Sequence, residues 1–91
     1  MIRFIFADTN TLIAIEREIA ARLECPYASH EWIAENGYMS IHESYYDTII
    51  GVLKEFDGEF EIKELVEVKV NEDGSEEIVF RNVDKSQLFT K

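Results

Sequence analysis

Hydrophobic and polar residues follow two different periods along this chain, and each period predicts a type of element. The first apolar run, residues 2–7 (IRFIFA), is rich in β-branched and aromatic residues and predicts a strand. In residues 11–25 (TLIAIEREIAARLEC), apolar positions recur at helical spacing. We expect Asp8 or Thr9 to cap this helix and the following proline to stop it at or before Cys25. Its apolar stripe consists of Leu12, Ile15, Ile19 and Leu23.

A short helix is predicted next, over residues 30–35 (HEWIAE). Ser29 precedes it and is a residue type that accepts a hydrogen bond from a first-turn amide. Asn36 and Gly37 follow it, and glycine adopts the left-handed conformation that ends many helices.

A longer helix is predicted to begin at Ile41. In SIHE, Ser40 stands three residues before Glu43, which is the capping-box pattern. Gly58 is expected to end this helix. Its apolar stripe consists of Ile41, Tyr45, Ile49, Val52, Leu53 and Phe56.

Residues 60–80 alternate with the period of a strand and predict a β-hairpin. The two strands pair best when their apolar faces match, because a slip of one residue moves every side chain to the other face. This condition places Val68 opposite Ile78 and Val66 opposite Phe80. Glu64 interrupts the apolar face of the first strand.

The same register leaves residues 72–74 (EDG) as a three-residue loop. Gly74 then occupies the position where such loops need a left-handed residue, and Lys69 lies opposite Glu77. A two-residue Asp-Gly turn satisfies the turn chemistry equally well but mispairs the apolar faces. We therefore favour the three-residue loop.

The order strand, helix, short helix, helix, strand, strand predicts one α+β domain over residues 1–91. Apolar residues make up 46% of the chain, enough for a core. The single cysteine, Cys25, excludes an intramolecular disulfide and favours a reducing compartment. With neither a signal peptide nor an apolar span of membrane length, a cytoplasmic protein is expected.

Negative charge is concentrated in residues 55–77, which carry ten acidic residues and two lysines. This segment holds a net charge of −8 out of −10 for the chain. Clustered Lys and Arg residues, which phosphate contacts require, are missing, so direct nucleic-acid binding is not expected. A strongly negative protein is instead attracted to basic surfaces.

A metal-dependent enzyme is one alternative. FIFADTNTLIAI resembles the opening of the PIN-domain nucleases, and YMSIHESYYDTIIGVL loosely resembles their second motif. The resemblance implies Asp8 and Glu43 as carboxylate ligands of Mg²⁺. PIN domains are longer, however, and carry their later acids on a strand–helix unit where this chain has a hairpin. Asp8 fits equally well as a helix cap.

Other catalytic patterns are weaker. His30 and His42 each precede a glutamate but form neither an HExxH motif nor a metal-ligand cluster. Cys25 has no neighbouring base in the sequence. We therefore expect no metal, no cofactor and no enzymatic activity.

The acidic residues themselves are the candidate contact surface. Two pairs are four residues apart, at the spacing that shares a helix face, and others crowd the hairpin, where like charges repel. In the simplest interpretation they are solvated surfaces that keep the protein dispersed. The candidate partner-binding residues are Glu31, Glu35, Glu43, Asp47, Asp57, Glu59, Glu61, Glu64, Glu67, Glu72, Asp73, Glu76 and Glu77.

In length, acidity and expected α+β class, the chain is similar to small phage-encoded DNA-mimic proteins. These include anti-restriction proteins such as phage T4 Arn, uracil-glycosylase inhibitors and some anti-CRISPRs. The resemblance implies an inhibitor whose carboxylates replace DNA phosphates on a basic partner protein. A homodimer would extend the acidic surface beyond what one small domain spans. Such a partner would be a restriction or CRISPR nuclease or another DNA-handling protein. An antitoxin-like or regulatory subunit with one dedicated partner is a further alternative. The aromatic residues that would supply buried anchors at such a contact, or that equally belong to the core, are Tyr27, Trp32, Tyr38, Tyr45 and Tyr46. Because the neighbouring Tyr45 and Tyr46 cannot both face inward, we expect at least one of them to be exposed.

Overall fold

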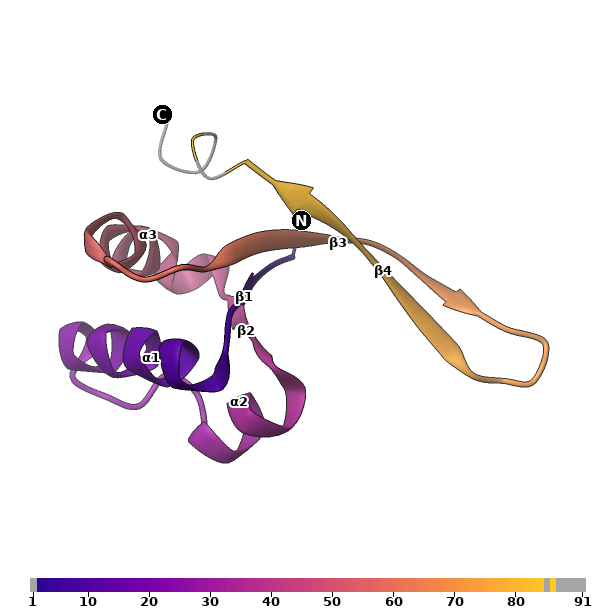
Figure 1. Cartoon of the computed structure of the whole chain (residues 1–91), viewed down its shortest axis with the longest axis horizontal. Coiled ribbons are helices and arrows are strands. Elements are labelled where there is room, and N and C mark those ends of the chain that lie inside the picture. Colours follow the sequence, from indigo (N-terminus) through magenta and orange to yellow (C-terminus); the bar gives the residue numbers. More distant parts are fainter. Residues whose placement is uncertain (1, 85, 87–91) are drawn as a thin grey trace.

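A computed structural model describes residues 2–84 and 86, and it confirms the predicted α+β class. Three α-helices and one 3₁₀ turn accompany a four-stranded antiparallel sheet (Figure 1). In chain order the elements are β1 (Arg3–Phe6), α1 (Thr9–Leu23), α2 (His30–Asn36), β2 (Tyr38–Ile41), η1 (Glu43–Tyr45), α3 (Tyr46–Glu55), β3 (Glu61–Val70) and β4 (Glu76–Val83).

The strands are ordered β2-β1-β3-β4, so the N-terminal strand lies inside the sheet. Figure 1 shows α1 and α3 together on one side of the strands. Ile5, opposite both Met39 and Ile62, is fully buried on this side of the sheet. The predicted stripe of α1 packs into the same core: Leu12, Ile15 and Ile19 are fully buried, and Leu23 is partly buried against them. The core therefore forms a single layer between the sheet and these two helices.

The predicted ends of the first two helices are confirmed. Asp8 is the cap position of α1, although its side chain makes no capping hydrogen bond. The left-handed Glu24 ends α1 just before Cys25. At α2, the Ser29 hydroxyl accepts a hydrogen bond from the Trp32 amide, at 3.4 Å.

The predicted capping box at Ser40 is wrong. Ser40 lies in β2, opposite Phe4 of β1, and α3 begins only at Tyr46. The four residues of β2 alternate between the two sheet faces, with Met39 and Ile41 buried. This period-two pattern is too short to stand out from the helical stripe that follows it. The helix also ends at Glu55, earlier than expected.

The hairpin register is confirmed at its outer end and shifts near the core. Val68 pairs with Ile78 and Lys69 with Glu77, as predicted. Phe80 pairs with Leu65 rather than with Val66, because a β-bulge lies between Leu65 and Glu67. The extra residue in β3 changes which face each side chain occupies on the two sides of the bulge.

The three-residue loop of the hairpin is also confirmed. The Asn71 amide donates to the Ser75 carbonyl at 2.8 Å and closes a loop of Glu72, Asp73 and Gly74. Gly74 has φ +87°, the left-handed conformation that glycine adopts without a steric penalty.

A buried carboxylate joins α1 to the segment that leads into α2. Glu16 is only 3% exposed and accepts hydrogen bonds from the Tyr27 amide at 3.1 Å and the Ala28 amide at 3.4 Å. His30 Nε2 lies 2.9 Å from its second oxygen. Burial raises the pKa of Glu16, but these hydrogen bonds outweigh burial and leave the pKa below its ordinary value. Glu16 was not identified from the sequence.

We expect Glu16→Ala to lower the free energy of unfolding by about 2 kcal/mol, because two amides lose their acceptor. Urea unfolding followed by circular dichroism measures this change. Glu18→Ala is the matched control, since Glu18 is exposed on the same helix, and its effect should stay within about 0.5 kcal/mol. Equal effects of the two substitutions would contradict a structural role for Glu16.

The Glu16 contribution should also depend on pH. Its folded-state pKa lies below the ordinary 4.5, so the carboxylate adds stability above that pH and loses it as the pH falls through the folded-state pKa. The stability difference between wild type and Glu16→Ala should therefore be constant well above pH 4.5 and shrink below it. Urea titrations at several pH values test this, and a difference that grows on acidification would refute it.

Candidate interaction surfaces

A charged triplet spans three strands where the four-stranded sheet ends. Arg3, Glu64 and Arg81 are direct neighbours across β1, β3 and β4. Arg3 Nε lies 3.6 Å from Glu64 Oε2, and Arg81 forms an ion pair with the other carboxylate oxygen. Glu64 is 2% exposed. It was predicted to contact a partner, but its carboxylate is occupied inside the protein, so this residue does not offer free charge at the surface.

Immediately after this triplet, the hairpin leaves the sheet. The Leu65 amide bonds to the Ile2 carbonyl at 2.9 Å, and beyond the bulge β3 pairs only with β4. We call residues 66–79 the arm. Figure 1 shows it projecting away from the helices as a twisted two-stranded ribbon.

One face of the arm is apolar although it is exposed. Val68 and Ile78 form a cross-strand pair, and each is 47% exposed. Val70, on the same face, is 71% exposed, and Val66 at the bulge is 54% exposed. Exposed apolar residues gathered on one projecting element are typical of a binding surface.

The tip of the arm, residues 71–77, carries four carboxylates and no basic residue. Glu72 and Asp73 lie in the loop, and Glu76 and Glu77 begin β4. Hydrogen bonds from the Ser75 hydroxyl at 2.6 Å and amide at 3.0 Å lower the pKa of Asp73, so it stays ionised. The nearest lysine, Lys69, pairs with Glu67 at 3.5 Å.

The sheet face opposite the core carries aromatic rings, which we call the open face. Phe80 of β4 contacts Phe4 and Phe6 of β1, with ring centroids 5.5 and 5.2 Å away. Tyr38 stacks on Phe6 at 5.1 Å and meets the 41%-exposed Trp32 edge-on at 5.4 Å. These rings shield one another only in part. Because Phe80 and Ile78 are two residues apart on β4, the open face continues into the apolar face of the arm.

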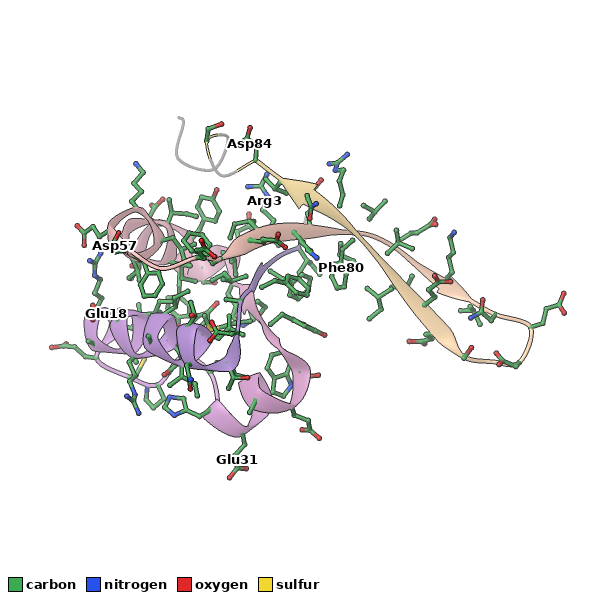
Figure 2. All side chains as sticks on the ribbon, viewed as in Figure 1. Arg3, Glu18, Glu31, Asp57, Phe80 and Asp84 are labelled. Carbon is green, nitrogen blue, oxygen red and sulfur yellow. The ribbon has the colours of Figure 1, made fainter. Side chains whose placement is uncertain are left out.

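The remaining predicted acidic residues are exposed but do not lie together. Glu31 and Glu35 are on α2, while Asp57 and Glu59 connect α3 to β3. Glu61 forms an ion pair with Lys63. Figure 2 shows Glu31 and Asp57 on separate sides of the molecule, both away from the arm. The arm tip, in contrast, holds four of the predicted acidic residues within seven consecutive positions.

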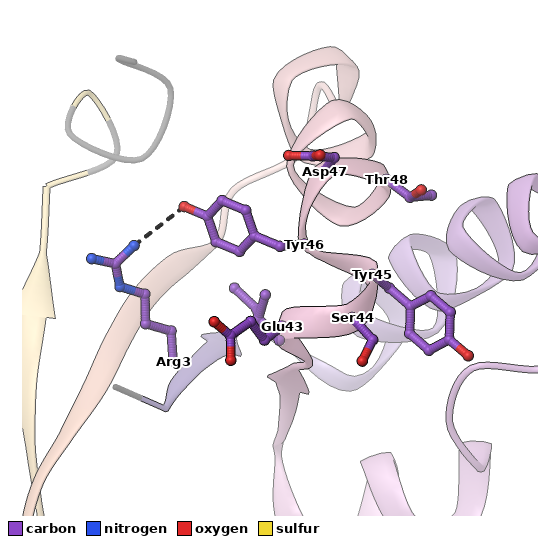
Figure 3. A pocket seen from close by; sticks show the side chains of 8 residues that line it. Arg3, Glu43, Ser44, Tyr45, Tyr46, Asp47 and Thr48 are labelled. Atoms are coloured by element: carbon purple, nitrogen blue, oxygen red, sulfur yellow. Dashed lines mark hydrogen bonds between the residues drawn. The ribbon is translucent and has the colours of Figure 1, made fainter.

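Glu43 and Asp47 share a pocket at the start of α3, with a volume of about 660 Å³. In Figure 3, Tyr46 points toward Arg3, whose Nη1 donates to its hydroxyl at 3.3 Å. Tyr45 points away and is 43% exposed, so the prediction that at least one of these tyrosines faces outward is confirmed. The pocket is therefore lined by the guanidinium group of Arg3 and by the carboxylates of Glu43 and Asp47.

The two carboxylates that the PIN resemblance implies are separated. The antiparallel register pairs Phe6 with Tyr38 and Arg3 with Ile41. Asp8 therefore follows one end of β1, while Glu43 lies beyond the opposite end. Among residues 2–84 and 86, no three His, Cys, Asp or Glu side chains are grouped to hold a metal ion.

Comparison of the chain with protein-family models, with curated proteins and with solved structures finds no match. Within the described part of the chain, none of the helices has the length and apolar character needed to cross a membrane.

Neutralising Glu64 should destabilise the sheet where the arm begins. We expect Glu64→Gln to lower the free energy of unfolding by about 1–2 kcal/mol, because two arginines lose their shared counter-ion. The cost is moderated because Arg81 is largely exposed and can turn to water. Glu67→Gln removes an exposed ion pair in the same strand and should change stability by less than about 0.5 kcal/mol. Guanidinium unfolding curves that coincide for the two variants would contradict this interpretation.

Proposed function

We propose that the protein is a non-enzymatic, cytoplasmic inhibitor that inserts its acidic arm into the basic, nucleic-acid-binding surface of a partner protein. The observation that carries the proposal is the projecting ribbon whose tip has four carboxylates and no base. A narrow ribbon enters a cleft that a globular surface cannot reach. The arm, rather than the whole acidic surface, is thus the proposed DNA mimic.

The charge density of the tip supports this proposal. Neighbouring residues of a β-strand rise about 3.3 Å, close to the roughly 3.4 Å between successive charges along one strand of duplex DNA. Glu76 and Glu77 point to opposite faces of the ribbon, and Glu72 and Asp73 lie at its end. Negative charge therefore surrounds the tip, as phosphates surround a duplex. A groove that binds DNA would exchange counter-ions for these carboxylates.

The apolar face of the arm supplies the second part of the contact. Charge complementarity mainly speeds and orients association, whereas buried apolar residues slow dissociation. Val68, Val70 and Ile78 lie next to the charged tip, on one face of the same ribbon. A cleft with an apolar wall and a basic end would be complementary to both.

The same apolar face favours one alternative, an antitoxin-like or regulatory subunit with a single dedicated partner. Apolar contacts tolerate salt, while phosphate-like contacts weaken steeply as salt rises. Salt dependence therefore separates the two proposals.

Displacement of proteins from DNA tests the proposal. Bacterial DNA-binding proteins are loaded from lysate onto immobilised duplex DNA, and the purified protein is added at low salt. We expect it to release at least one bound protein, and we expect release to fall as salt is raised.

Two charge-matched variants locate the activity. The arm variant combines Glu72→Gln, Asp73→Asn, Glu76→Gln and Glu77→Gln. The helix variant removes the same number of charges through Glu31→Gln, Glu35→Gln, Glu43→Gln and Asp47→Asn. The arm variant should need about tenfold or more protein for equal release, whereas the helix variant should act like wild type. Equal losses, or no release by wild type, would reject the proposal. Release that persists at high salt would favour the antitoxin-like alternative.

A further inference from the structure

The two edges of the sheet differ in length. β2 forms one edge and has four residues, Tyr38–Ile41. β4 forms the other and has eight residues, Glu76–Val83, with no proline and no bulge of its own. No described residue pairs with the outer side of β4. Long unprotected edges of this kind accept another strand.

The hydrogen bonds of the hairpin show which backbone groups of β4 point outward. The Ser75 carbonyl accepts from Asn71, so it faces β3. Both backbone groups of a strand residue point to the same side and alternate along an antiparallel strand. Glu77 and Val79 therefore also bond to β3, while Ile78 and Phe80 direct their backbone groups outward. The bulge lies in β3, so this alternation continues unbroken along β4.

We infer that the outer edge of β4 pairs antiparallel with β4 of a second copy of this chain, with Val79 opposite Val79 on the two-fold axis. This inference does not depend on the proposed function. A two-fold interface must be self-complementary, and only registers that place outward-facing residues opposite each other can form backbone bonds.

Among those registers, the one centred on Val79 matches both faces of the strand. On the open face, Ile78 lies opposite Phe80 of the second copy, and the reverse pair repeats on the other side of the axis. On the core face, Glu77 lies opposite Arg81 of the second copy, again twice. Non-hydrogen-bonded pairs such as this one bring side chains closest together, which suits an ion pair.

The neighbouring registers lose this complementarity. The next permitted registers are centred on Ile78 or on Phe80. They place Glu77 opposite Val79 or opposite Val83, and in both Arg81 loses its acidic partner. In the favoured register, Arg81 serves both its own Glu64 and the second copy, because a guanidinium has five donors and this side chain is 64% exposed. Within the described residues Glu77 forms no ion pair of its own, since Lys69 pairs with Glu67.

The paired sheet would have eight strands and one continuous open face. The two arms would run in opposite directions, each beside the second copy's β4 near its core. Ile78, half-exposed in a single copy, would gain an aromatic neighbour. Each copy carries a net charge of −10, so the local Glu–Arg pairs would also offset a general repulsion between the copies.

Sedimentation velocity from micromolar to millimolar protein, at about 0.15 M salt, tests the inference. Wild type should sediment as a dimer whose dissociation constant can be measured. Glu77→Lys sets an ammonium opposite Arg81 and should raise that constant about tenfold or more. Glu76→Lys changes the charge equally, but Glu76 lies opposite Asn82, so its constant should stay unchanged or fall.

A backbone variant tests the edge independently of charge. The Ile78 amide points away from β3, so Ile78→Pro leaves the hairpin bonds in place and blocks the outer edge. We expect a monomer with the circular dichroism spectrum of wild type. A wild type that stays monomeric to millimolar concentration, equal weakening by the two lysine variants, or a dimeric Ile78→Pro protein would each overturn the inference.

Discussion

The carboxylate of Glu64, held between the guanidinium groups of Arg3 and Arg81, is the constraint on which the sheet arrangement depends. It ties the N-terminal strand and the C-terminal strand to β3 at one level. A buried carboxylate requires such compensation, because removing a charge from water without a partner is costly. The triplet also lies where β1 begins, and beyond this level the hairpin continues without β1 as a neighbour. The apolar core lies on one side of this level and the arm on the other.

This arrangement sorts the acidic residues into two groups. Glu16 and Glu64 are buried and paired inside the protein, so they act as structural groups. The others remain in water, and the arm tip gathers four of them without a base of its own. The excess charge noted in the sequence is therefore divided among internal ion pairs, separate exposed carboxylates and one projecting end. The exposed carboxylates are available to another molecule, and the arm tip gathers four of them within seven positions.

Much of the fold was predictable because local chemistry decides it. Helix caps at Ser29 and Asp8 and the loop at Gly74 follow from preferences that act within a few residues. The short strand β2 was missed because four alternating residues next to a helical stripe carry too little signal, and pairing with β1 decides their conformation. The ion pairs of Glu64 could not be predicted either, because Arg3 lies 61 positions before it and Arg81 lies 17 positions after it in the chain. In the sequence, this role of Glu64 was indicated by its position within the apolar face of the predicted strand.

The bulge at Val66 divides β3 into a part that packs on the core and a part that is exposed to solvent. Before it, every second residue of β3 faces the core, and substitutions there are limited by volume and by loss of burial. After it, both faces meet solvent, and the remaining limits are turn chemistry and strand propensity. One inserted residue thus separates positions limited by core packing from positions limited mainly by turn chemistry and strand propensity. Point substitutions in the arm can therefore change its surface chemistry while the folded body that carries it stays the same.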